Sequence, residues 1–302
     1  MFIKNEKLKG AALMVSACAV FGVMASLVKL VIHIDAFVIG LWRFVIGMGL
    51  LTAAALSGKI QLKFNNRRLL FVRGLLGGVG IVVTFFAIVN LGMSKGMVLA
   101  STYPLFAFIL SVIVLKERPD VVSALMIAAA FAGICLVVAG KNGDALIFSG
   151  VGFYEILAIS VGLIGGIVVV TIRKLHQTDS SYAIFFSQCA IGFCIAVVPA
   201  GTGAGSVCFR DGLILALIGI TATIGQLMMT QSYKYLPVRT GATLAMLEPV
   251  FCCLAGVGIF GEIFSAKSIV GTFLIIGSCV AVVLHGARPV NSRQSGLQSG
   301  GG

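Results

Sequence analysis

Apolar runs of membrane-spanning length, about twenty residues each, follow one another along nearly the whole chain, and they constrain the fold more than any other feature. Of the 302 residues, 59% are hydrophobic and only 11% are charged. A soluble domain has about 25% charged residues. A helix rises about 1.5 Å per residue, so each run is long enough to cross the apolar core of a bilayer. The composition therefore excludes a water-soluble fold and predicts an all-α integral membrane protein.

Ten spans are predicted, and the loops between them are too short to hold a soluble domain. Their boundaries are 11–32, 36–56, 69–90, 95–115, 121–139, 150–172, 181–200, 212–233, 238–260 and 267–285. The first run is longer than the apolar core of a signal peptide and is interpreted as a retained span. Residues 1–10 are expected to form a cytoplasmic N-terminal tail, and residues 287–302 a disordered C-terminal tail.

The distribution of basic residues predicts the orientation in the membrane. Sixteen lysines and arginines lie on the side of the N-terminus, and four lie in the opposite loops. Cytoplasmic loops of membrane proteins carry an excess of these residues. Both termini are therefore predicted to be cytoplasmic, in the inner (cytoplasmic) membrane. The same asymmetry accounts for the net charge of +12 without a nucleic-acid partner.

Two apolar blocks, Leu99–Glu117 and Leu244–Glu262, each have a proline near the start and a glutamate thirteen positions later. They are separated by 145 positions, and the same offset gives these further matches: Lys29/Lys174, Leu30/Leu175, Gly47/Gly192, Gly74/Gly219, Gly80/Gly225, Leu91/Leu236 and Gly96/Gly241. Five spans per half is an odd number, so the second half enters the membrane upside down. The predicted architecture is ten transmembrane helices as two inverted five-helix repeats, residues 11–140 and 149–286, with a site between them near the midplane.

Among the differences between the two blocks, one places a charge in the apolar run: the first block has Tyr103 before its proline, and the second has Glu248. Glu248 lies about 15 Å into its span, near the middle of a ~30 Å apolar core. Such carboxylates usually face a cavity or a partner. Glu248 is therefore the candidate for proton coupling or for binding a cationic substrate group; the alternative is a residue that only holds helices together. Pro104 and Pro249 predict two kinked helices that form a gate, or two static kinks.

Arg43 is the second deep charge, about 10 Å into its span. Its planar guanidinium suits a carboxylate, either on a substrate or on Glu248. The alternative is that it snorkels to the outer interface. The equivalent position in the second half is Gln188, which is polar but neutral, so the site is expected to be asymmetric. Three aromatic residues are candidates for lining the cavity, although rings in spans more often pack or face lipid: Trp42, Tyr103 and Phe86.

The remaining polar residues are assigned structural roles. Glu117 and Glu262 end the fourth span of each half and are expected to cap the next helix or to pair with loop cations. Gln226 is expected either to line the cavity or to form an interhelical hydrogen bond. Seven of the eight cysteines lie in apolar runs and are interpreted as packing residues. No ligand set for a metal and no soluble-type cofactor motif is found, so neither a metal nor a cofactor is expected.

Ten short spans in two halves, each ending its fourth span on a glutamate, resemble the EamA-type branch of the drug/metabolite transporter superfamily. The residues that carry the resemblance are Arg43-Phe44, Arg73-Gly74-Leu75 and the two proline–glutamate blocks. The resemblance covers residues 11–285. It implies a secondary transporter, an exporter or exchanger of a small polar metabolite such as an amino acid or S-adenosylmethionine, working by alternating access. It specifies the family and leaves the substrate open.

Functions other than secondary transport are compatible with part of the sequence. A membrane scaffold or sensor that transports nothing stays open, as does multidrug-type efflux of a hydrophobic cation. An intramembrane enzyme would need a nucleophile–base pair or a metal cluster at depth, and the sequence has none, so no enzymatic activity is expected. The expected partners are a small-molecule substrate and the lipid bilayer, with a monomer and a homodimer both open.

Overall fold

The computed structural model describes residues 2–31, 33–91, 102–117, 121–142, 153–201, 207–261 and 265–287. Within these ranges every regular element is a helix, and no described residue lies in a strand. The helices are α1 (Phe2–Leu30), α2 (Ala36–Leu56), α3 (Arg67–Leu91), α5 (Tyr103–Val114), α6 (Val121–Asn142), α7 (Phe153–Leu175), α8 (Ser181–Gly201), α9 (Phe209–Tyr235), α10 (Val238–Ala245), α11 (Glu248–Phe260) and α12 (Ala266–Ala287).

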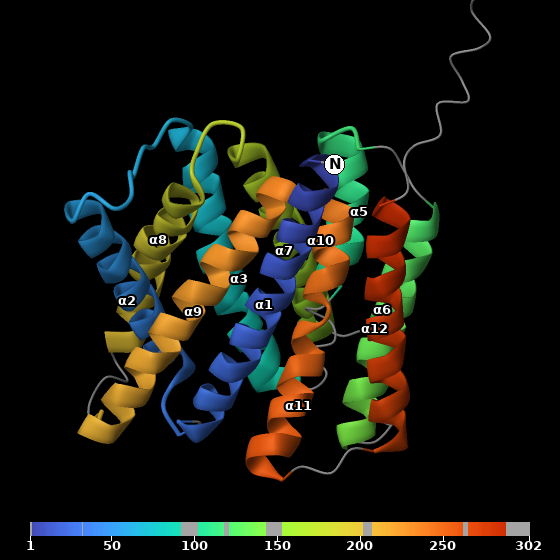
Figure 1. Cartoon of the computed structure of the whole chain (residues 1–302). Coiled ribbons are helices and arrows are strands. Elements are labelled where there is room, and N and C mark those ends of the chain that lie inside the picture. Colours follow the sequence, from blue (N-terminus) through green and yellow to red (C-terminus); the bar gives the residue numbers. More distant parts are fainter. Residues whose placement is uncertain are drawn as a thin grey trace, which may run out of the picture.

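The helices lie side by side and run from one end of the molecule to the other (Figure 1). In the described residues seven helical stretches are long and apolar enough to cross a membrane. Two shorter helical stretches, Tyr103–Val114 and Val121–Val137, are also apolar. If α10 and α11 are counted as the two halves of one span, the described helices form ten spans, which confirms the predicted fold class.

Most predicted span ends lie within three residues of the observed helix ends, and the span at 36–56 coincides with α2. The N-terminal tail differs from its prediction, because residues 2–10 are the first turns of α1. Lysines are good helix formers, so the helix continues beyond the apolar segment. Gly10 already packs on α9 and its end, where an added Cβ would lie 2.8 Å from Leu236 Cγ. The predicted C-terminal tail lies outside the described residues beyond position 287.

The two halves pack on each other symmetrically. Shifting each helix by one repeat pairs α1 with α7, α2 with α8, α3 with α9, α5 with α11 and α6 with α12. The helix contacts obey this exchange: α1 packs on α9 as α7 packs on α3, α2 on α9 as α8 on α3, and α5 on α7 as α11 on α1. The equivalent helices α2 and α8 also pack on each other, as do α6 and α12. This is the packing expected of two inverted repeats related by a pseudo-two-fold axis.

Small residues allow close approach at one of the two symmetric contacts. An added Cβ at Gly133 of α6 would lie 2.7 Å from the carbonyl oxygen of Gly271 in α12. An added Cβ at Gly271 would lie 2.5 Å from the carbonyl oxygen of Gly133. Without a hydrophobic driving force in lipid, membrane helices associate through such close backbone contacts. The two glycines therefore hold α6 and α12, the last helices of the two repeats, together.

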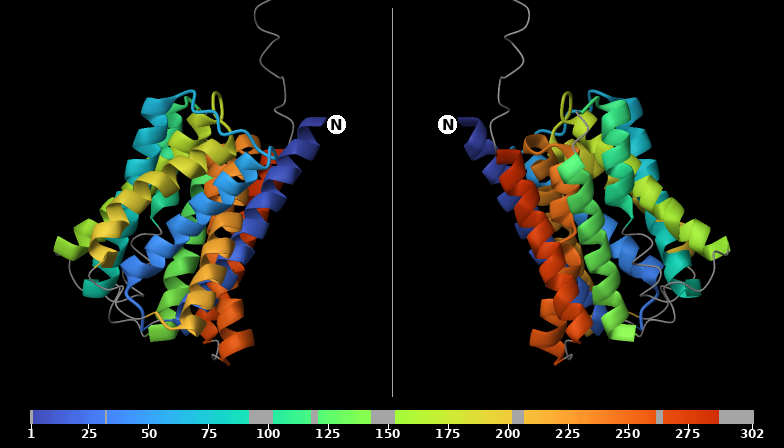
Figure 2. Two further views of the ribbon diagram at one scale, coloured as in Figure 1. Left: turned by 90° about the vertical axis from the view of Figure 1, so that its left-hand side faces the viewer. Right: turned by 90° about the vertical axis from the view of Figure 1, so that its right-hand side faces the viewer.

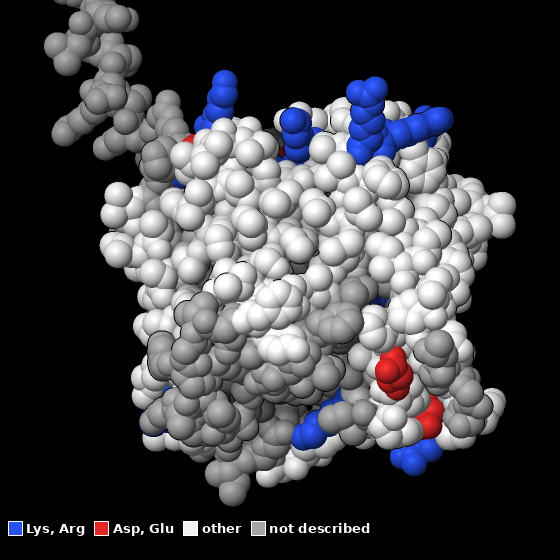
Figure 3. All heavy atoms as spheres, turned by 180° about the vertical axis from the view of Figure 1, so that it is seen from behind, with Lys and Arg blue, Asp and Glu red and all other residues white. Residues whose placement is uncertain are grey.

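The outer surface is apolar over most of its height. Large exposed hydrophobic side chains occur on most helices, for example Ile113, Phe153, Phe209 and Phe273. Figure 3 shows a broad uncharged band across one face, with lysine and arginine side chains gathered at one edge. The N-terminus lies at this edge, and α12 also ends there (Figures 1 and 2). The band is the surface that a multi-pass membrane protein presents to lipid.

Candidate functional site

The span predicted at 238–260 is broken in its middle. The first half-helix, α10, ends at Ala245, and the second, α11, begins at Glu248. Between them the backbone tightens into a turn, in which the Met246 N–H donates to the Thr243 carbonyl at 3.1 Å. Helix ends leave backbone groups without intrahelical partners. The break therefore exposes carbonyl groups of α10 and N–H groups of α11 deep in the bundle.

Proline begins the second half-helix of this span. Pro249 is the second residue of α11, and Pro104 is the second residue of α5. The first turn of a helix accommodates proline well, because the N–H that proline lacks has no helical partner there. The structure thus replaces the predicted kink at Pro249 with a break between two half-helices. The segment 92–101, which precedes α5, lies outside the described residues.

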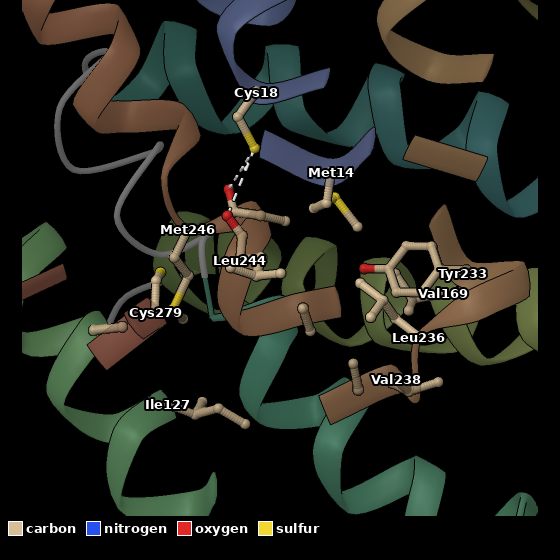
Figure 4. Close-up of a cluster of buried hydrophobic side chains, with 14 of the residues drawn as sticks. Met14, Cys18, Ile127, Val169, Tyr233, Leu236, Val238, Leu244, Met246 and Cys279 are labelled. Carbon is tan, nitrogen blue, oxygen red and sulfur yellow. Dashed lines mark hydrogen bonds between the residues drawn. The ribbon is translucent and has the colours of Figure 1, made fainter. Parts of the chain in front are cut away.

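Two thiol groups bind the carbonyl groups that the break exposes. The Cys18 thiol of α1 donates to the carbonyl oxygens of Leu244 and Ala245, at 3.6 and 3.8 Å (Figure 4). The Cys279 thiol of α12 donates to the Thr243 carbonyl at 3.3 Å. Both cysteines were predicted to be packing residues only. They are buried, but they also add a donor to these carbonyls, of which those of Thr243 and Leu244 also accept from backbone N–H groups of the turn.

Tyr103 and Glu248 occupy equivalent positions in the two repeats. Tyr103 is the first residue of α5, and Glu248 is the first residue of α11. Both side chains are half-buried, and they lie close enough to interact electrostatically. The N-terminus of a helix favours a negative charge, so the start of α11 suits the Glu248 carboxylate. The equivalent positions at the starts of α5 and α11 therefore hold a phenol in one repeat and a carboxylate in the other.

Glycines hold the starts of both half-helices against their neighbours. An added Cβ at Gly166 of α7 would lie 2.8 Å from Phe106 Cβ of α5. In the other half, an added Cβ at Gly22 of α1 would lie 2.9 Å from Phe251 Cβ of α11. Phe106 and Phe251 are 145 positions apart and thus equivalent. Close packing on a helix of the opposite repeat therefore positions the starts of α5 and α11.

Arg43 is bound within the bundle. Its side chain is half-buried, and its Nη2 donates to Oε1 of Gln226 in α9 at 3.1 Å. Its Nε is buried and has no hydrogen-bond partner. Its charge interacts with that of Glu248, although no hydrogen bond or ion pair joins the two in the described part of the chain. The hydrogen bond to Gln226 directs the Arg43 guanidinium toward α9 and leaves its buried Nε without a partner.

Arg73 of α3 is the buried cation that the sequence analysis missed. Its side chain is only 1% exposed, and its Nη2 donates to Oε1 of Gln188 at 2.8 Å. Its Nε and Nη1 are buried without hydrogen-bond partners. In the sequence analysis, Arg73 appears as part of the Arg73-Gly74-Leu75 motif of the family. Its position about 9 Å into α3 is the signal that could have identified it as a charge deep in the membrane. Gln188 is equivalent to Arg43, so one of these equivalent positions is an arginine and the other accepts a hydrogen bond from an arginine of a neighbouring helix.

Glu117 has a structural partner in the other repeat. Its Oε1 accepts a hydrogen bond from the N–H of Val238, the first residue of α10, at 3.2 Å. Helix capping was expected, but of the next helix in the chain, α6. The observed cap joins the end of the fourth span to the start of the broken span. Glu262, the counterpart of Glu117, lies outside the described residues.

The other predicted residues are placed as follows. Trp42 packs against a buried apolar cluster of Val31, Leu215 and Ile218. The side chain of Phe86 lies outside the described part of the structure. Among the described residues no group of three or more His, Cys, Asp or Glu side chains is arranged to hold a metal. A shallow pocket of about 290 Å³ opens away from the break, lined by Phe64, Arg67, Leu70, Phe71, Ser187 and Ile191.

Both halves of the chain match the same family model. The model of the EamA-like transporter family matches residues 8–139 and again residues 152–284. The chain belongs to the EamA-like transporter family. The two matched ranges coincide with the two five-helix halves of this EamA-like transporter.

Relatives of this EamA-like transporter include bacterial and mammalian proteins. The pseudopaline exporter CntI of Pseudomonas aeruginosa is 25% identical, over 90% of this chain and 95% of its own. An uncharacterized transporter of Helicobacter pylori is 24% identical, over 93% of this chain and 97% of its own. Solute carrier family 35 member G1 of Mus musculus is 22% identical, over 88% of this chain and 75% of its own.

A crystal structure of another protein has the same fold. It superposes with a TM-score of 0.78, covering 94% of this chain and 98% of the other, at 18% sequence identity. At this identity the likeness concerns the fold alone. Together with the family match, it makes this protein a multi-pass membrane transporter, for which a small-molecule substrate and a lipid environment follow.

Proposed function

We propose that this protein is a secondary carrier that exports or exchanges a small polar organic metabolite by alternating access. The observation that carries the proposal is the broken span, with Glu248 at the start of α11 beside Tyr103 at the start of α5, between two inverted repeats. In secondary transporters, broken helices near the bilayer midplane form the substrate site. The name of the Pseudomonas aeruginosa relative, an exporter, supports outward transport.

The site residues take distinct roles in this proposal. Glu248 binds a proton or an amino group of the substrate, since a carboxylate at this depth is retained where it has a cationic partner or a coupling role. Arg43 binds a substrate carboxylate through its unused Nε donor and stays attached to Gln226. The Tyr103 hydroxyl, opposite Glu248, adds a polar contact to the same substrate. Trp42 and Phe86 are proposed to line the path at its edge.

Alternating access would use the repeats as the moving units, residues 11–140 against residues 149–286. Pro104 and Pro249 mark where the half-helices begin and therefore where the gate bends. The bonds that hold the break come from thiols, which are weak donors, so rearranging them costs little free energy. No covalent step is required of the protein, and we propose a carrier without enzymatic activity.

We also propose that the protein lies in the inner membrane with both termini in the cytoplasm. Of the sixteen lysines and arginines counted on the side of the N-terminus, Arg73 is buried in α3, and the other fifteen still outnumber the four in the opposite loops. Lysine and arginine side chains gather at this edge in Figure 3. Such an excess is typical of cytoplasmic loops.

The proposal is tested with purified protein in two steps. A solute library is first screened by thermal shift in detergent, and each stabilising solute is then used in counterflow with reconstituted liposomes. The proposal expects labelled solute to accumulate transiently in liposomes preloaded with the same solute. Pro249→Ala, which restores the missing N–H and favours a continuous helix, is expected to lower the exchange rate at least tenfold. Protein that binds solutes but moves none across the bilayer would contradict a carrier and favour a sensor.

A further inference from the structure

The side chain of Arg73 points deeper into the membrane and away from the nearest interface. Side chains on a helix usually lean toward its N-terminus, and lysine and arginine near a span end extend to the polar interface. Arg73 does the opposite: its Nη1 would lie 2.5 Å from a Cβ at Gly77, one turn further along α3. The missing side chain at Gly77 leaves the space that the guanidinium occupies.

This position leaves a buried cation incompletely satisfied. Arg73 is 1% exposed, and Gln188, its hydrogen-bond partner, is neutral and 5% exposed. The remaining two donors, Nε and Nη1, have no partner among the described residues. Burying a charge without an anion is strongly unfavourable. Such a residue destabilises the unliganded protein, and its presence is explained if a ligand supplies the missing anion.

Arg43 provides a second guanidinium near the first. The charges of Arg43 and Arg73 repel each other, and both interact with the buried thiol of Cys189, which follows Gln188 in α8. The helices that carry them both pack on this part of α8, since an added Cβ at Gly47 of α2 would lie 2.9 Å from Cys189 Sγ and one at Gly77 of α3 would lie 3.2 Å from Gln188 Cγ. Each guanidinium is held by one glutamine through a single Nη2, and each keeps a buried Nε for another acceptor.

Counting residues along α2 and α8 predicts that the two guanidiniums lie at different depths in the membrane. Arg43 is the eighth residue of α2, which enters from the outer face, and Gln188 is the eighth residue of α8, which enters from the opposite face. Both helices have 21 residues, so they are equally long. At 1.5 Å per residue the two positions differ in height by about 10 Å. Because both arginine side chains extend toward the middle of the membrane, the distance between the two guanidiniums would be shorter than this height difference, about the length of a small organic molecule.

We propose that Arg43 and Arg73 form a two-guanidinium anion site, and that the substrate is an organic anion with two carboxylate groups. Each arginine binds one carboxylate through the donors that glutamine leaves unused. When Glu248 carries the proton proposed above, the two arginines give the site a charge of +2, which a dianion balances. The inference rests on the proposed transport function and specifies the substrate class; the same charge excess disfavours a hydrophobic cation.

The test measures thermal stabilisation of the full, purified chain by matched probes. The probes are succinate, glutarate and adipate, each compared with its half-amide and its diamide, which remove one or both charges at constant length. We expect at least one dianion to stabilise the wild type more than its half-amide, and the diamide to have no effect. In Arg73→Gln and in Arg43→Gln the affinity for that dianion should fall at least tenfold, to the level of the half-amide, while Arg68→Gln, an exposed cation of the same helix, should bind as the wild type does.

A structural role for Arg73 predicts a different result. The double variant Arg73→Met, Gln188→Leu replaces both polar partners by apolar groups, and it should unfold at the same temperature as the unliganded wild type or higher, yet lose dianion binding. A lower unfolding temperature would assign Arg73 a structural role and overturn the proposal. So would half-amides that stabilise as well as every dianion, or no stabilisation by any dianion. If no dianion binds but other solutes are exchanged in counterflow, the dianion site is wrong and the proposed carrier function stands. If dianions bind but no solute is exchanged, the carrier function is wrong and the dianion site stands.

Discussion

Tyr103 and Glu248 lie 145 positions apart, and Tyr103 begins α5 as Glu248 begins α11, so equivalent positions of the two repeats hold a phenol and a carboxylate. The two side chains interact electrostatically within the bundle. The duplicated scaffold supplies two equivalent positions, and a single difference in sequence makes one of them ionisable. The two positions thus have equivalent places in the fold and different chemistry, which is the basis of the role proposed for Glu248.

The contact between α7 and the start of α5 leads to a first prediction. An added Cβ at Gly165 would lie 2.8 Å from Tyr103 Cβ. Gly165→Ala should therefore lower stability, because overpacking costs about 1–3 kcal/mol and outweighs the helix-propensity gain of about 1 kcal/mol. Gly258→Ala in α11 is the matched control, since nothing lies within 4 Å of its added Cβ, and it should be neutral or stabilising. Thermal unfolding in detergent measures both, and equal effects would show that α7 does not fix Tyr103.

The thiol of Cys18 provides a second prediction. Cys18→Ala removes this donor from the Ala245 carbonyl, while the Leu244 carbonyl still accepts from the Leu247 N–H at 3.0 Å, and we expect a loss of about 1 kcal/mol. Cys18→Ser keeps a donor and should lose less. Cys194→Ala, at an exposed position, serves as the control for removing a sulfur. If Cys18→Ala and Cys194→Ala unfold alike, the thiol does not support the break.

The cap on α10 provides a third prediction. Glu117→Ala removes the acceptor for the Val238 N–H and should destabilise the protein by about 1 kcal/mol, as loss of a helix cap does. Glu117→Gln keeps an oxygen acceptor and should be milder. Hydrogen exchange of the first turn of α10 is the direct readout. Unchanged protection there in Glu117→Ala would mean that another group caps the helix.

His176, which follows the last residue of α7, provides a prediction for pH. Burial, with help from the positive charges of Arg173 and Lys234, lowers the pKa of His176 below its usual 6.5, while its hydrogen bond to the Thr230 carbonyl opposes the shift. The unfolded chain therefore binds the proton more readily, so this contribution to stability is complete above pH ~6.5 and is lost as the pH falls below it.

The measurement compares thermal unfolding of the wild type and His176→Gln between pH 8 and pH 5. Acidification should lower the unfolding temperature of the wild type more than that of the variant. In the wild type, Nε2 of His176 lies 2.7 Å from the Thr230 carbonyl oxygen, and the glutamine amide of the variant can donate to the same oxygen. All other titrating groups are common to both proteins, so the difference reports on His176. An equal or smaller loss in the wild type would reverse the assigned direction.

The number of spans and their inverted order could be predicted because each depends on local sequence. Every span is an apolar run, and the span at 36–56 was placed without error. The equivalence of Pro104 and Pro249 likewise followed from a fixed offset. These features need no knowledge of which helices touch.

The break and the second arginine depend on contacts between distant residues. Pro249 indicates a lost hydrogen bond, but whether the helix bends or restarts depends on donors such as Cys18, which is 227 positions from Ala245. The direction of Arg73 depends on Gln188, 115 positions away, and on the space beside Gly77. A single sequence shows how deep in its span a residue lies. It does not show which neighbouring helix the side chain contacts.

The central claim, that Glu248 at the break couples transport to a proton, is tested most directly in proteoliposomes with an imposed pH gradient. The substrate found by screening is followed in the wild type, in Glu248→Gln and in Glu117→Gln, a control carboxylate at the end of α5. The account predicts that Glu248→Gln loses gradient-driven accumulation but still exchanges labelled for unlabelled substrate, and that Glu117→Gln keeps both. Full gradient-driven accumulation in Glu248→Gln would contradict it.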